Sequence, residues 1–423
     1  TSPRIDALAQ KSTVFERAYT VVPHTSFSIA SLLTGKYAFS LGGLGLLAGH
    51  ETLADLLRRY RYKTAAFYPP AVFYVDGEQF KSYENSFYGF EYARYEPFVE
   101  DRDAPARTDQ VIDFFVNERP ARAFVWVHYF GPHEPYVPHP EVAPSFGGRA
   151  MDAYDDEVRW VDREVGRLLD FLHKERPNAI IVLTADHGEE FGEHGGAYHG
   201  STLFDEQVRV PLIVHVPGDQ SRRVRVPVST VDVVPTVAAT LDIPIGLRVR
   251  GVDRTPWLSE QPPPQAPPVF AEIGELKMVV AEGVKLVCHT VRAYCTLYDL
   301  AADPGEQKDV AAAHADRVAR LNAHLSAWIA SHGDFETASE PRARLLERGS
   351  LGDRRALPEL LELLADKSAL PSERAQVAEI FCKVLDDRAR DGLRAAATGD
   401  PDPRVRAWAA VALSTNGDSS ATT

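Results

Sequence analysis

An aspartate and a histidine stand side by side where an apolar stretch gives way to a glycine-rich loop. Residues 181–185 read Ile-Val-Leu-Thr-Ala and are followed by Asp186, His187 and Gly188. The apolar run predicts a buried parallel strand, and open α/β sheets bind ligands at the carboxyl ends of such strands. A carboxylate and an imidazole at that edge could hold a divalent metal ion or move protons. In the alternative interpretation, the two polar residues only terminate the strand.

A threonine near the amino terminus could supply a nucleophile. Residues 3–20 predict a short amphipathic helix followed by a strand over residues 14–19, which Pro23 interrupts. The spacing then predicts a helix over residues 26–34 that Gly35 ends, with Thr25 at the N-cap position. A hydroxyl beside the free N–H groups and the positive end of a helix dipole suits attack on an anionic ester. In the alternative interpretation, Thr25 only caps the helix.

Histidines occur in the glycine-rich loop and in an earlier loop. His199 precedes Gly200, and His133 lies within Pro-His-Glu-Pro-Tyr at residues 132–136. An imidazole has a pKa near neutrality, so it suits contact with a transferring group or protonation of a leaving oxygen. Glu189, Glu190 and His194 are interpreted as residues that support the site residues from behind or belong to the loop. Three other histidines are interpreted as structural or surface residues: His24, His128 and His139.

These residues belong to a series of short motifs spread over residues 1–332. The series runs Leu-Leu-Thr-Gly at 32–35, Tyr-Lys-Thr-Ala-Ala at 62–66, Gly-Phe-Glu at 89–91, Pro-His-Glu-Pro-Tyr at 132–136, Thr-Ala-Asp-His-Gly at 184–188, His-Gly at 199–200, Arg-Val-Pro-Leu at 209–212, Asp-Val-Val-Pro-Thr at 232–236 and Leu-Tyr-Asp-Leu at 297–300. Each motif is weak alone, but their order resembles the sulfatase branch of the alkaline-phosphatase superfamily. The resemblance implies an α/β fold, with a central, mostly parallel sheet flanked by helices and a small C-terminal antiparallel subdomain.

The resemblance also implies roles for single residues. Counting back from residues 32–35 places the family's nucleophile on Thr25. Asp186 and His187 take the place of metal ligands, and His133 and His199 that of catalytic and substrate-binding groups. Lys285 corresponds to a substrate-binding lysine of the family. In the alternative interpretation, Lys285 is only a solvated lysine on a strand.

The sequence departs from the family pattern at the nucleophile. The family has Cys or Ser where this chain has Thr25, and Arg where it has Ile29. Sulfatases oxidise that Cys or Ser to formylglycine, and threonine cannot follow because its carbinol carbon carries a methyl group. We therefore expect no formylglycine. A threonine alkoxide can still attack phosphorus, as in the phosphodiesterases of the superfamily.

Two further departures concern the substrate and the metal. The family's Gly-Lys-Trp-His segment is replaced by Tyr-Pro-Pro-Ala at residues 68–71, and the pair of aspartates that completes the metal site would lie upstream of residues 1–6, on a central strand. The resemblance implies one divalent metal ion, Ca²⁺ first, with Mg²⁺, Mn²⁺ and Zn²⁺ also represented. Because a hard cation needs about six oxygen ligands, we expect residues 1–423 by themselves to bind such an ion weakly and to turn over poorly, unless an upstream segment supplies the carboxylates.

Beyond a catalytic domain predicted over residues 1–256, composition marks a linker and a second part of the same fold. Residues 257–268 are proline-rich and predict an extended surface linker. Residues 269–298 alternate as three or four antiparallel strands, with a turn at Glu282-Gly283. A helix predicted over residues 311–331 completes a subdomain at 269–332.

Short amphipathic helices dominate the C-terminal part. They are predicted over residues 341–346, 356–364, 373–385, 391–397 and 400–413. The Asp-Pro and Val-Arg pattern before an alanine-rich helix resembles HEAT-like repeats, predicted over residues 338–415. Such repeats could bind a protein partner or pack as an appendage. The tail at residues 416–423 is polar and predicted to be disordered.

Composition excludes some classes of function. The chain has 423 residues and a net charge of −14, which argues against general binding to nucleic-acid phosphates. No run of about 18 apolar residues predicts a membrane span. Of three cysteines, Cys288 and Cys295 could pair across the predicted hairpin, which leaves the compartment open. The family resemblance favours a periplasmic or otherwise extracytoplasmic location.

Together these features predict a metal-dependent hydrolase of sulfate or phosphate esters that acts on a small anionic substrate through Thr25. Threonine favours phosphodiester or phosphotransfer chemistry on mechanistic grounds. The alternative is a catalytically degenerate relative that serves as a binding or scaffold module, which Thr25, Ile29 and the missing aspartates support.

Overall fold

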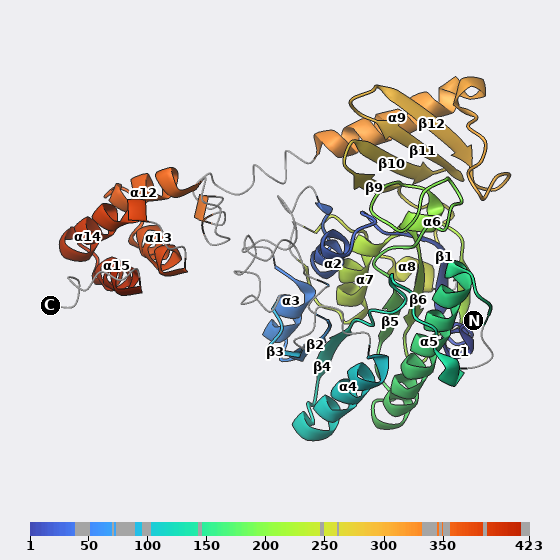
Figure 1. Ribbon diagram of the computed structural model, residues 1–423, viewed down its shortest axis with the longest axis horizontal. Helices are drawn as coiled ribbons and strands as arrows, with labels where there is room; N and C mark the ends of the chain where they lie inside the picture. Colours follow the sequence, from blue (N-terminus) through green and yellow to red (C-terminus); the bar gives the residue numbers. More distant parts are fainter. Residues whose placement is uncertain are drawn as a thin grey trace. The chain divides into compact units, whose positions relative to one another are not determined.

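The computed structural model describes residues 1–38, 51–69, 72, 89–94, 103–142, 146–245, 249–259, 262–331, 345, 346, 349, 356–383 and 387–415. The described residues fall into two compact units, one within residues 1–331 and the other within residues 345–415 (Figure 1). Among these residues, no helix combines the length and the apolar character that crossing a membrane requires.

A five-stranded mixed sheet forms the centre of the first unit. Its strands are β1 (Thr13–Tyr19), β5 (Ile181–Thr184), β6 (Arg209–His215), β7 (Arg222–Val224) and β8 (Val228–Ser229). They follow the order β5-β6-β1-β7, with β8 also paired to β1. Strand β1 runs parallel to β7 and β8 and antiparallel to β6. Residues 3–20 were predicted to form a helix and a strand, and α1 (Pro3–Ala9) and β1 confirm this.

Strand β5 was predicted to be a buried parallel strand, and this prediction is wrong. It pairs antiparallel with β6, and all four of its residues are only half-buried. A parallel neighbour needs a crossover connection, usually a helix that packs on the sheet. Between β5 and β6 the chain forms only the four-residue helix α6 (Asp205–Val208) and turns back on itself.

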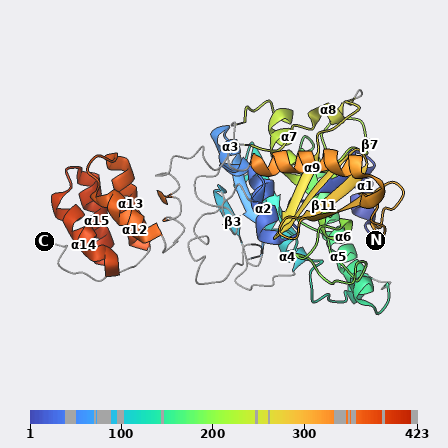
Figure 2. The same ribbon diagram turned by 90° about the horizontal axis from the view of Figure 1, so that it is seen from above.

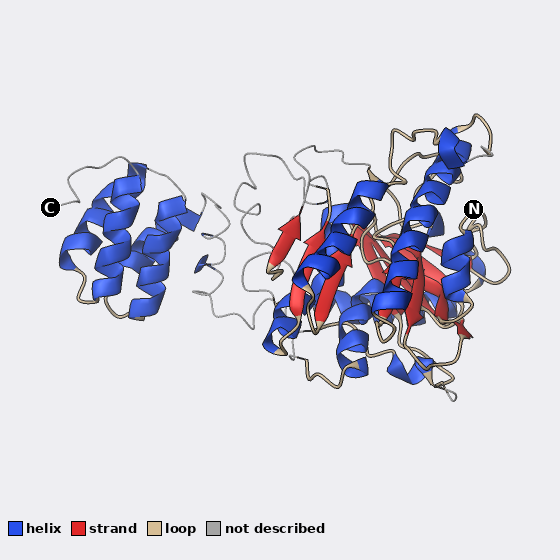
Figure 3. Cartoon of the chain, turned by 90° about the horizontal axis from the view of Figure 1, so that it is seen from below, coloured by secondary structure: helices blue, strands red, loops and turns tan. Residues whose placement is uncertain are grey.

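A three-stranded parallel sheet has the order β3-β2-β4, from β2 (Lys63–Phe67), β3 (Tyr92–Arg94) and β4 (Ala123–Val127). One face packs against α4 (Ala104–Glu118) and α5 (Ala150–Glu175) through Phe67, Phe114 and Leu168. Figure 3 shows these helices lying along the strands. Phe124 of β4 instead contacts the cluster of α3 (Leu53–Arg59) and α7 (Val233–Thr240). The two sheets with flanking helices confirm the α/β class.

Strands β4 and β5 differ from their neighbours in exposure. Every residue of both strands is half-buried, although their sequences are almost entirely apolar. Four of the five residues of β2 are fully buried. Within the described part of the chain, β4 pairs with β2 and β5 with β6, so each has a neighbouring strand on one edge. Their apolar side chains therefore remain partly accessible.

A separate antiparallel sheet of four strands has the order β12-β11-β10-β9. Its strands are β9 (Val269–Ile273), β10 (Leu276–Ala281), β11 (Val284–His289) and β12 (Tyr294–Asp299). Glu282 and Gly283 turn the chain with positive φ angles, as predicted. Helix α9 (Ala315–Ala330) crosses this sheet (Figure 2), where Leu321, Leu325 and Trp328 pack on the strands.

Cys288 and Cys295 face each other across β11 and β12 and form a disulfide, which confirms the pairing suggested by the sequence. The proline-rich linker begins later than predicted. Trp257 and Leu258 belong to helix α8 (Thr255–Leu258) and are buried against β1 and β6, because their large apolar side chains fill the core of the central sheet. The remaining short elements of this unit are α2 (Thr25–Thr34), η4 (Pro140–Val142), η5 (Thr230–Asp232) and η6 (Ala311–Ala313).

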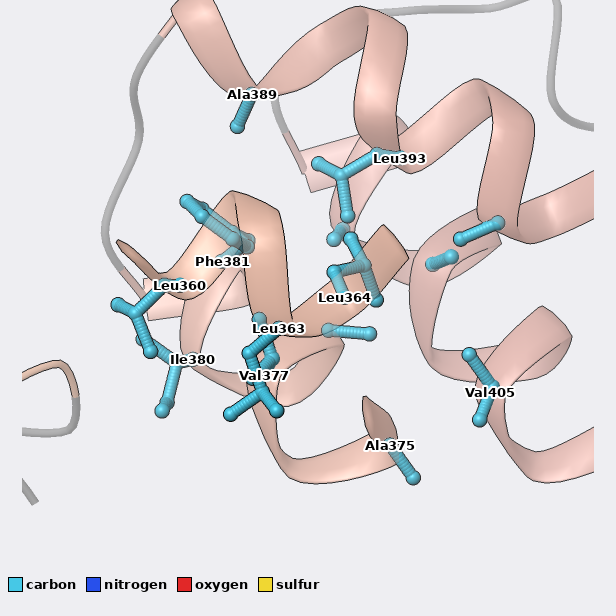
Figure 4. Packing of buried hydrophobic residues seen from close by; sticks show 14 of the residues in the cluster. Leu360, Leu363, Leu364, Ala375, Val377, Ile380, Phe381, Ala389, Leu393 and Val405 are labelled. Carbon is cyan, nitrogen blue, oxygen red and sulfur yellow. The ribbon is translucent and has the colours of Figure 1, made fainter. Parts of the chain in front are cut away.

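The second unit consists of helices. They are α12 (Leu357–Ala365), α13 (Pro371–Lys383), η8 (Asp387–Ala389), α14 (Arg390–Gly399) and α15 (Pro403–Thr415), close to four of the predicted helices. Figure 4 shows Leu360, Leu363, Phe381 and Leu393 meeting in one apolar cluster. Most of the helix predicted over residues 341–346, and all of the tail predicted over 416–423, lie outside the described residues.

Candidate active site

Thr25 is the first residue of helix α2. The prediction that it is the N-cap is wrong, because the N-cap is His24, whose backbone is extended at φ −150° and ψ 127°. The Thr25 hydroxyl is therefore not used to cap the helix. Its Oγ1 lies 3.1 Å from Nε2 of His187, which follows β5. A hydroxyl at the start of a helix, within hydrogen-bond reach of an imidazole, has the arrangement of an activated nucleophile.

The backbone of its own loop orients the His187 ring. Nδ1 lies 2.9 Å from the carbonyl oxygen of Gly188, so Nδ1–H donates there and Nε2 can accept the Thr25 proton. Oδ2 of Asp186 lies 3.4 Å from the same Nε2. The ring also stacks on His199, with 3.9 Å between ring centroids.

Local contacts bring α2 to the end of β5. The Ser28 hydroxyl of α2 donates to the carbonyl oxygen of Asp186 at 2.6 Å. Gly188 then allows the chain to pass close to α6, because a Cβ atom at this position would lie 2.2 Å from the carbonyl oxygen of Glu206. Its N–H donates to the carbonyl oxygen of Gln207 at 2.9 Å. These contacts explain why glycine follows the Asp-His pair.

His133 is positioned by a buried glutamate. The carboxylate of Glu157, on α5, accepts hydrogen bonds from the backbone N–H of His133 at 3.1 Å and of Val137 at 2.8 Å. Glu157 is only 1% exposed, so the loop that follows β4 is anchored to a rigid helix. The His133 ring stacks on Phe130 at 4.4 Å and lies 5.4 Å from the His199 ring.

His199 is held by another buried carboxylate. Its Nδ1 lies 3.0 Å from Oε1 of Glu189, whose side chain is 4% exposed. Burial by itself lowers the pKa of His199, but the hydrogen bond and the charge of Glu189 outweigh that effect and raise the pKa above its usual value. Glu189 thus sets both the orientation of this ring and its charge.

Asp186 remains ionised among the histidines. Burial would raise the pKa of its carboxyl group, but the charges of His187 and His128 outweigh burial and lower the pKa. Burial lowers the pKa of His24 and of His128, and neighbouring histidines lower both further. His24 and His128 were predicted to be structural or surface residues, but both lie near enough to interact electrostatically with Asp186 and His187.

Five of the six predicted site residues are joined by this chain of contacts: Thr25, His133, Asp186, His187 and His199. Lys285 is placed differently. Its ammonium group is fully buried and lies 2.7 Å from Asp205, 2.8 Å from Glu306 and 2.9 Å from the carbonyl oxygen of Leu203. We therefore leave it out of the candidate site.

The Asp186–His187 pair does not fit a hard divalent cation. Among the described residues, the pair belongs to no group of three or more acidic, histidine or cysteine side chains spaced to hold an ion. Two protein ligands are too few for Ca²⁺, which prefers six to eight oxygen atoms. The set of three that does occur is His133, Glu134 and His199.

Glu134 and Glu157 were not predicted from the sequence. Glu189 was interpreted as a supporting or loop residue, and it holds the His199 ring. Glu134 stands within the motif at residues 132–136, and that position is the signal that could have found it. Glu157 lies on a long amphipathic helix and carries no local signal, because its role depends on the loop that packs against it.

Comparison with known proteins identifies relatives. The family profile described as Sulfatase matches residues 1–243, more than half of the chain. The chain is 25% identical to an ulvan-active sulfatase from Formosa agariphila over 322 residues, 63% of this chain and 61% of that protein. It is 30% identical to a choline-sulfatase from Rhizobium meliloti over 172 residues, 38% of this chain and 33% of that protein. The chain thus spans less than two thirds of the length of these relatives.

Solved structures share the fold. One neighbour was solved in complex with its substrate D-glucosamine-2-N,6-O-disulfate. It has a TM-score of 0.66 and 18% sequence identity, and the match covers 79% of this chain and 93% of the neighbour. A phosphonate monoester hydrolase from Silicibacter pomeroyi has a TM-score of 0.64 and 21% identity, and covers 77% of this chain and 89% of that one. At these identities the likeness shows the fold alone.

Proposed function

This chain belongs to the sulfatase family, and from that premise we propose that it hydrolyses a small anionic sulfate or phosphate-type ester with Thr25 as the nucleophile. The observation that carries the proposal is the 3.1 Å distance between Thr25 Oγ1 and His187 Nε2. The Nδ1–H of His187 is donated to a backbone oxygen, so the nitrogen that faces Thr25 is the basic one. A nucleophile, a base and a group that orients the base are the parts that covalent catalysis requires.

In the proposed reaction, the Thr25 hydroxyl gives its proton to His187 while Oγ1 forms a bond to sulfur or phosphorus. The bond from that atom to the leaving oxygen breaks, and the leaving oxygen takes up a proton. Water then cleaves the Thr25 ester and restores the hydroxyl. The first N–H groups of α2 point toward this end of the helix and favour the negative charge that develops there.

The proposal also gives roles to His133 and His199, whose rings lie near each other in the candidate site. They contact the oxygens of the transferring group or protonate the leaving oxygen, as the resemblance implies. Their rings lie 5.4 Å apart, and His199 stacks on His187. Sulfatases generally use a divalent metal ion. Because the Asp186–His187 pair offers too few ligands for a hard cation, no step here is routed through an ion at that pair.

The choice between sulfur and phosphorus follows from the nucleophile. Threonine cannot be converted to formylglycine, so we propose direct attack by an alkoxide. That chemistry favours phosphodiester or phosphonate substrates over sulfate esters. A neighbour in fold is a phosphonate monoester hydrolase, which supports testing such substrates.

The test compares Thr25→Ala and Thr25→Ser on aryl sulfate, bis-aryl phosphate and aryl phosphonate substrates. We expect Thr25→Ala to lose about 10³-fold or more in turnover, of the order reported for loss of a catalytic group, and Thr25→Ser to retain activity. Thr34→Ala is the matched control, because its hydroxyl donates within the same helix to Ala30 and leaves the site untouched. Equal turnover by Thr25→Ala and the unchanged protein would overturn the proposal.

A second candidate is a degenerate relative that binds anionic esters or a protein partner without turnover. The two-ligand Asp186–His187 pair is the observation that favours it. Turnover that disappears in Thr25→Ala eliminates this candidate, whereas ester binding without turnover by the unchanged protein supports it. The HEAT-like assignment of α12–α15, and a partner for these helices, remain predictions.

We further propose an extracytoplasmic location. The disulfide between Cys288 and Cys295 supports this proposal, since disulfides persist in oxidising compartments and are rare in the cytosol. Mass spectrometry of the protein from its native host, with free thiols blocked before digestion, tests it. Recovery of Cys288 and Cys295 as blocked free thiols would count against it.

A further inference from the structure

Strand β1 contains a bulge that turns charged side chains to one side. The register shifts where two residues of β1, Glu16 and Arg17, stand opposite the single residue Pro211 of β6. Proline has no N–H to give to the ladder, and successive side chains of a regular strand point to opposite faces. Here Glu16, Arg17 and Tyr19 all line the same cavity. The bulge therefore gathers groups that a regular strand would separate.

The cavity brings three arginines together. It has a volume of about 270 Å³ and lies within the first unit. The arginines come from three segments of the chain: Arg17 on β1, Arg209 at the start of β6 and Arg225 directly after β7. Leu300 and Pro304, which follow β12, form an apolar part of the wall. Its volume is close to the lower end of the range for small-molecule sites.

Two carboxylates also line the cavity, but each already has a cation beside it. Asp205 lies 2.7 Å from Nζ of Lys285, and Glu16 lies 3.1 Å from Nε of Arg225. The side chain of Arg17 makes no hydrogen bond or ion pair with the residues that the structure describes. Its charge is therefore not offset by a contact, and a cation in a concave wall favours an anionic ligand.

A buried hydroxyl adds a hydrogen-bond donor to the same wall. Tyr19 lines the cavity, is only 1% exposed, and its hydroxyl has no hydrogen-bond partner among the described residues. Buried polar atoms nearly always have a partner, so such an atom needs an explanation. Burial raises the pKa of Tyr19, so its hydroxyl stays protonated and can donate. Arg17 and Arg209 lie near enough to oppose that rise, which places both guanidinium groups close to the hydroxyl.

Guanidinium groups from three segments suit a tetrahedral anion. The planar fork of arginine matches phosphate and carboxylate oxygens in pairs. A carboxylate offers its two oxygens in one plane, whereas a phosphate or sulfate group offers oxygens in several directions. Such a group can accept hydrogen bonds from donors that stand on separate strands.

We propose that this cavity binds a phosphate or sulfate group, held by Arg17, Arg209 and Arg225 with the Tyr19 hydroxyl as a further donor. Of the described residues that line the cavity, none belongs to the candidate active site, so this is a second anion site. The proposal goes beyond the proposed function and does not rest on it, because its test measures binding and not turnover.

The experiment uses the whole protein, residues 1–423, in a buffer free of phosphate and sulfate. Inorganic phosphate, inorganic sulfate and glucose 6-phosphate are each titrated by calorimetry at low ionic strength, where charges are least screened. We expect binding of one anion per chain at this cavity. Tighter binding of glucose 6-phosphate than of the inorganic ions would identify an ester as the ligand, and equal binding a free ion. No binding of any of the three probes would overturn the proposal.

Two substitutions with opposite expected effects locate the anion. Arg17→Gln should weaken phosphate binding at least about 10-fold, because a charge-assisted hydrogen bond is lost. Glu16→Gln removes the carboxylate that pairs with Arg225, so it should strengthen phosphate binding by about 3-fold or more. Damage to the fold would weaken binding in both variants, whereas this site requires opposite changes. Unchanged thermal unfolding without ligand shows that each variant folds.

Two controls keep the outcomes distinct. Arg223→Gln is the matched control, because Arg223 is an exposed residue of β7 that does not line the cavity. It should change phosphate affinity by less than about 3-fold. Phosphate affinity that falls in His133→Ala and stays unchanged in Arg17→Gln would place the anion in the candidate active site and overturn the proposal. Turnover of aryl esters is measured separately, so failure of the proposed reaction can be told apart from failure of this site.

Discussion

Neighbouring carboxylates divide four histidines of the described residues into two groups. His24 and His128 are half-buried, which lowers their pKa, and the adjacent histidines lower it further. His194 and His199 are also partly buried, but each hydrogen-bonds with a glutamate that outweighs burial and raises its pKa. At the scale of single residues, the partner of a histidine therefore decides its charge more than its position in the sequence does.

The pairing of His194 with Glu206 predicts a pH dependence of stability. Because the pKa of His194 is raised in the folded protein, its contribution to stability is complete below the unfolded pKa of about 6.5. That contribution is lost as pH rises through the folded pKa. We expect the melting temperature to fall above neutral pH by more in the unchanged protein than in His194→Gln. Parallel pH curves in thermal unfolding would contradict this assignment.

Lys285 provides a second prediction at this scale. Its fully buried ammonium group is the cation between Asp205 and Glu306. Lys285→Met would leave two carboxylates without that cation, and breaking a buried pair costs about 3–5 kcal/mol of unfolding free energy. Denaturant unfolding measures the loss, and Lys308→Met, at an exposed position, should cost almost nothing. A raised KM at unchanged stability would instead show that Lys285 contacts substrate.

At the scale of elements, loops anchored on rigid helices and strands position the site. Helix α5 holds the His133 loop through Glu157, and α2 is tied to the end of β5 through Ser28. The glycine-rich loop is closed by Gly188, which packs against the backbone of α6. Buried carboxylates and hydroxyls thus add to the backbone hydrogen bonds that these loops make, such as the bridge between Glu190 and Tyr198.

In the helical unit, a buried carboxylate likewise joins separate elements. The Asp400 carboxylate, before α15, accepts hydrogen bonds from Nε and Nη2 of Arg374 on α13 at 3.0 Å each, and from Lys367 at 2.9 Å. Arg374 and Asp400 are 1% and 2% exposed. We expect Asp400→Asn to lower the unfolding free energy of this unit by about 3 kcal/mol, because it weakens a buried pair. Chemical denaturation monitored by helix content measures it.

Asp391→Asn is the control, since the Asp391 side chain is 95% exposed in its pair with Arg394. It should change stability by less than about 1 kcal/mol.

Unfolding at acid pH gives an independent check of the Arg374–Asp400 pair. Burial alone would raise the pKa of Asp400, but Arg374 and Lys367 lower it far below its usual value. Its contribution is therefore present above pH ~3.9 and is lost only as pH falls through the lower, folded pKa. An equal loss of helix near pH 4 in the unchanged protein and in Asp400→Asn would argue against the buried pair.

At the scale of the whole molecule, the described chain has two units that each bury a core of their own. Proteins of this kind do not in general unfold in a single two-state transition. We expect scanning calorimetry to show more than one transition. Asp400→Asn should lower one of them and Lys285→Met another. A single transition that both substitutions shift equally would show that the two units unfold together.

Local features of the sequence determined much of the fold. The helix and strand of residues 3–20, the turn at Glu282-Gly283 and four helices of the second unit were all predicted, because hydrophobic periodicity and turn chemistry act over a few residues. The ordered motifs indicated the sulfatase family, and the family profile confirms it. Those motifs contain four of the five predicted residues that meet in the candidate site, and counting back from residues 32–35 located the fifth, Thr25.

The tertiary structure alone decided how those residues meet. Thr25 and His187 are 162 positions apart, so only packing could turn the hydroxyl toward the imidazole rather than toward its own helix. Packing likewise paired β5 antiparallel to β6 and enclosed Lys285 between two carboxylates. It also brought Glu134 to the two histidines. Periodicity and turn chemistry report on neighbours in the chain, whereas a binding site consists of neighbours in space, and those depend on how every element packs at once.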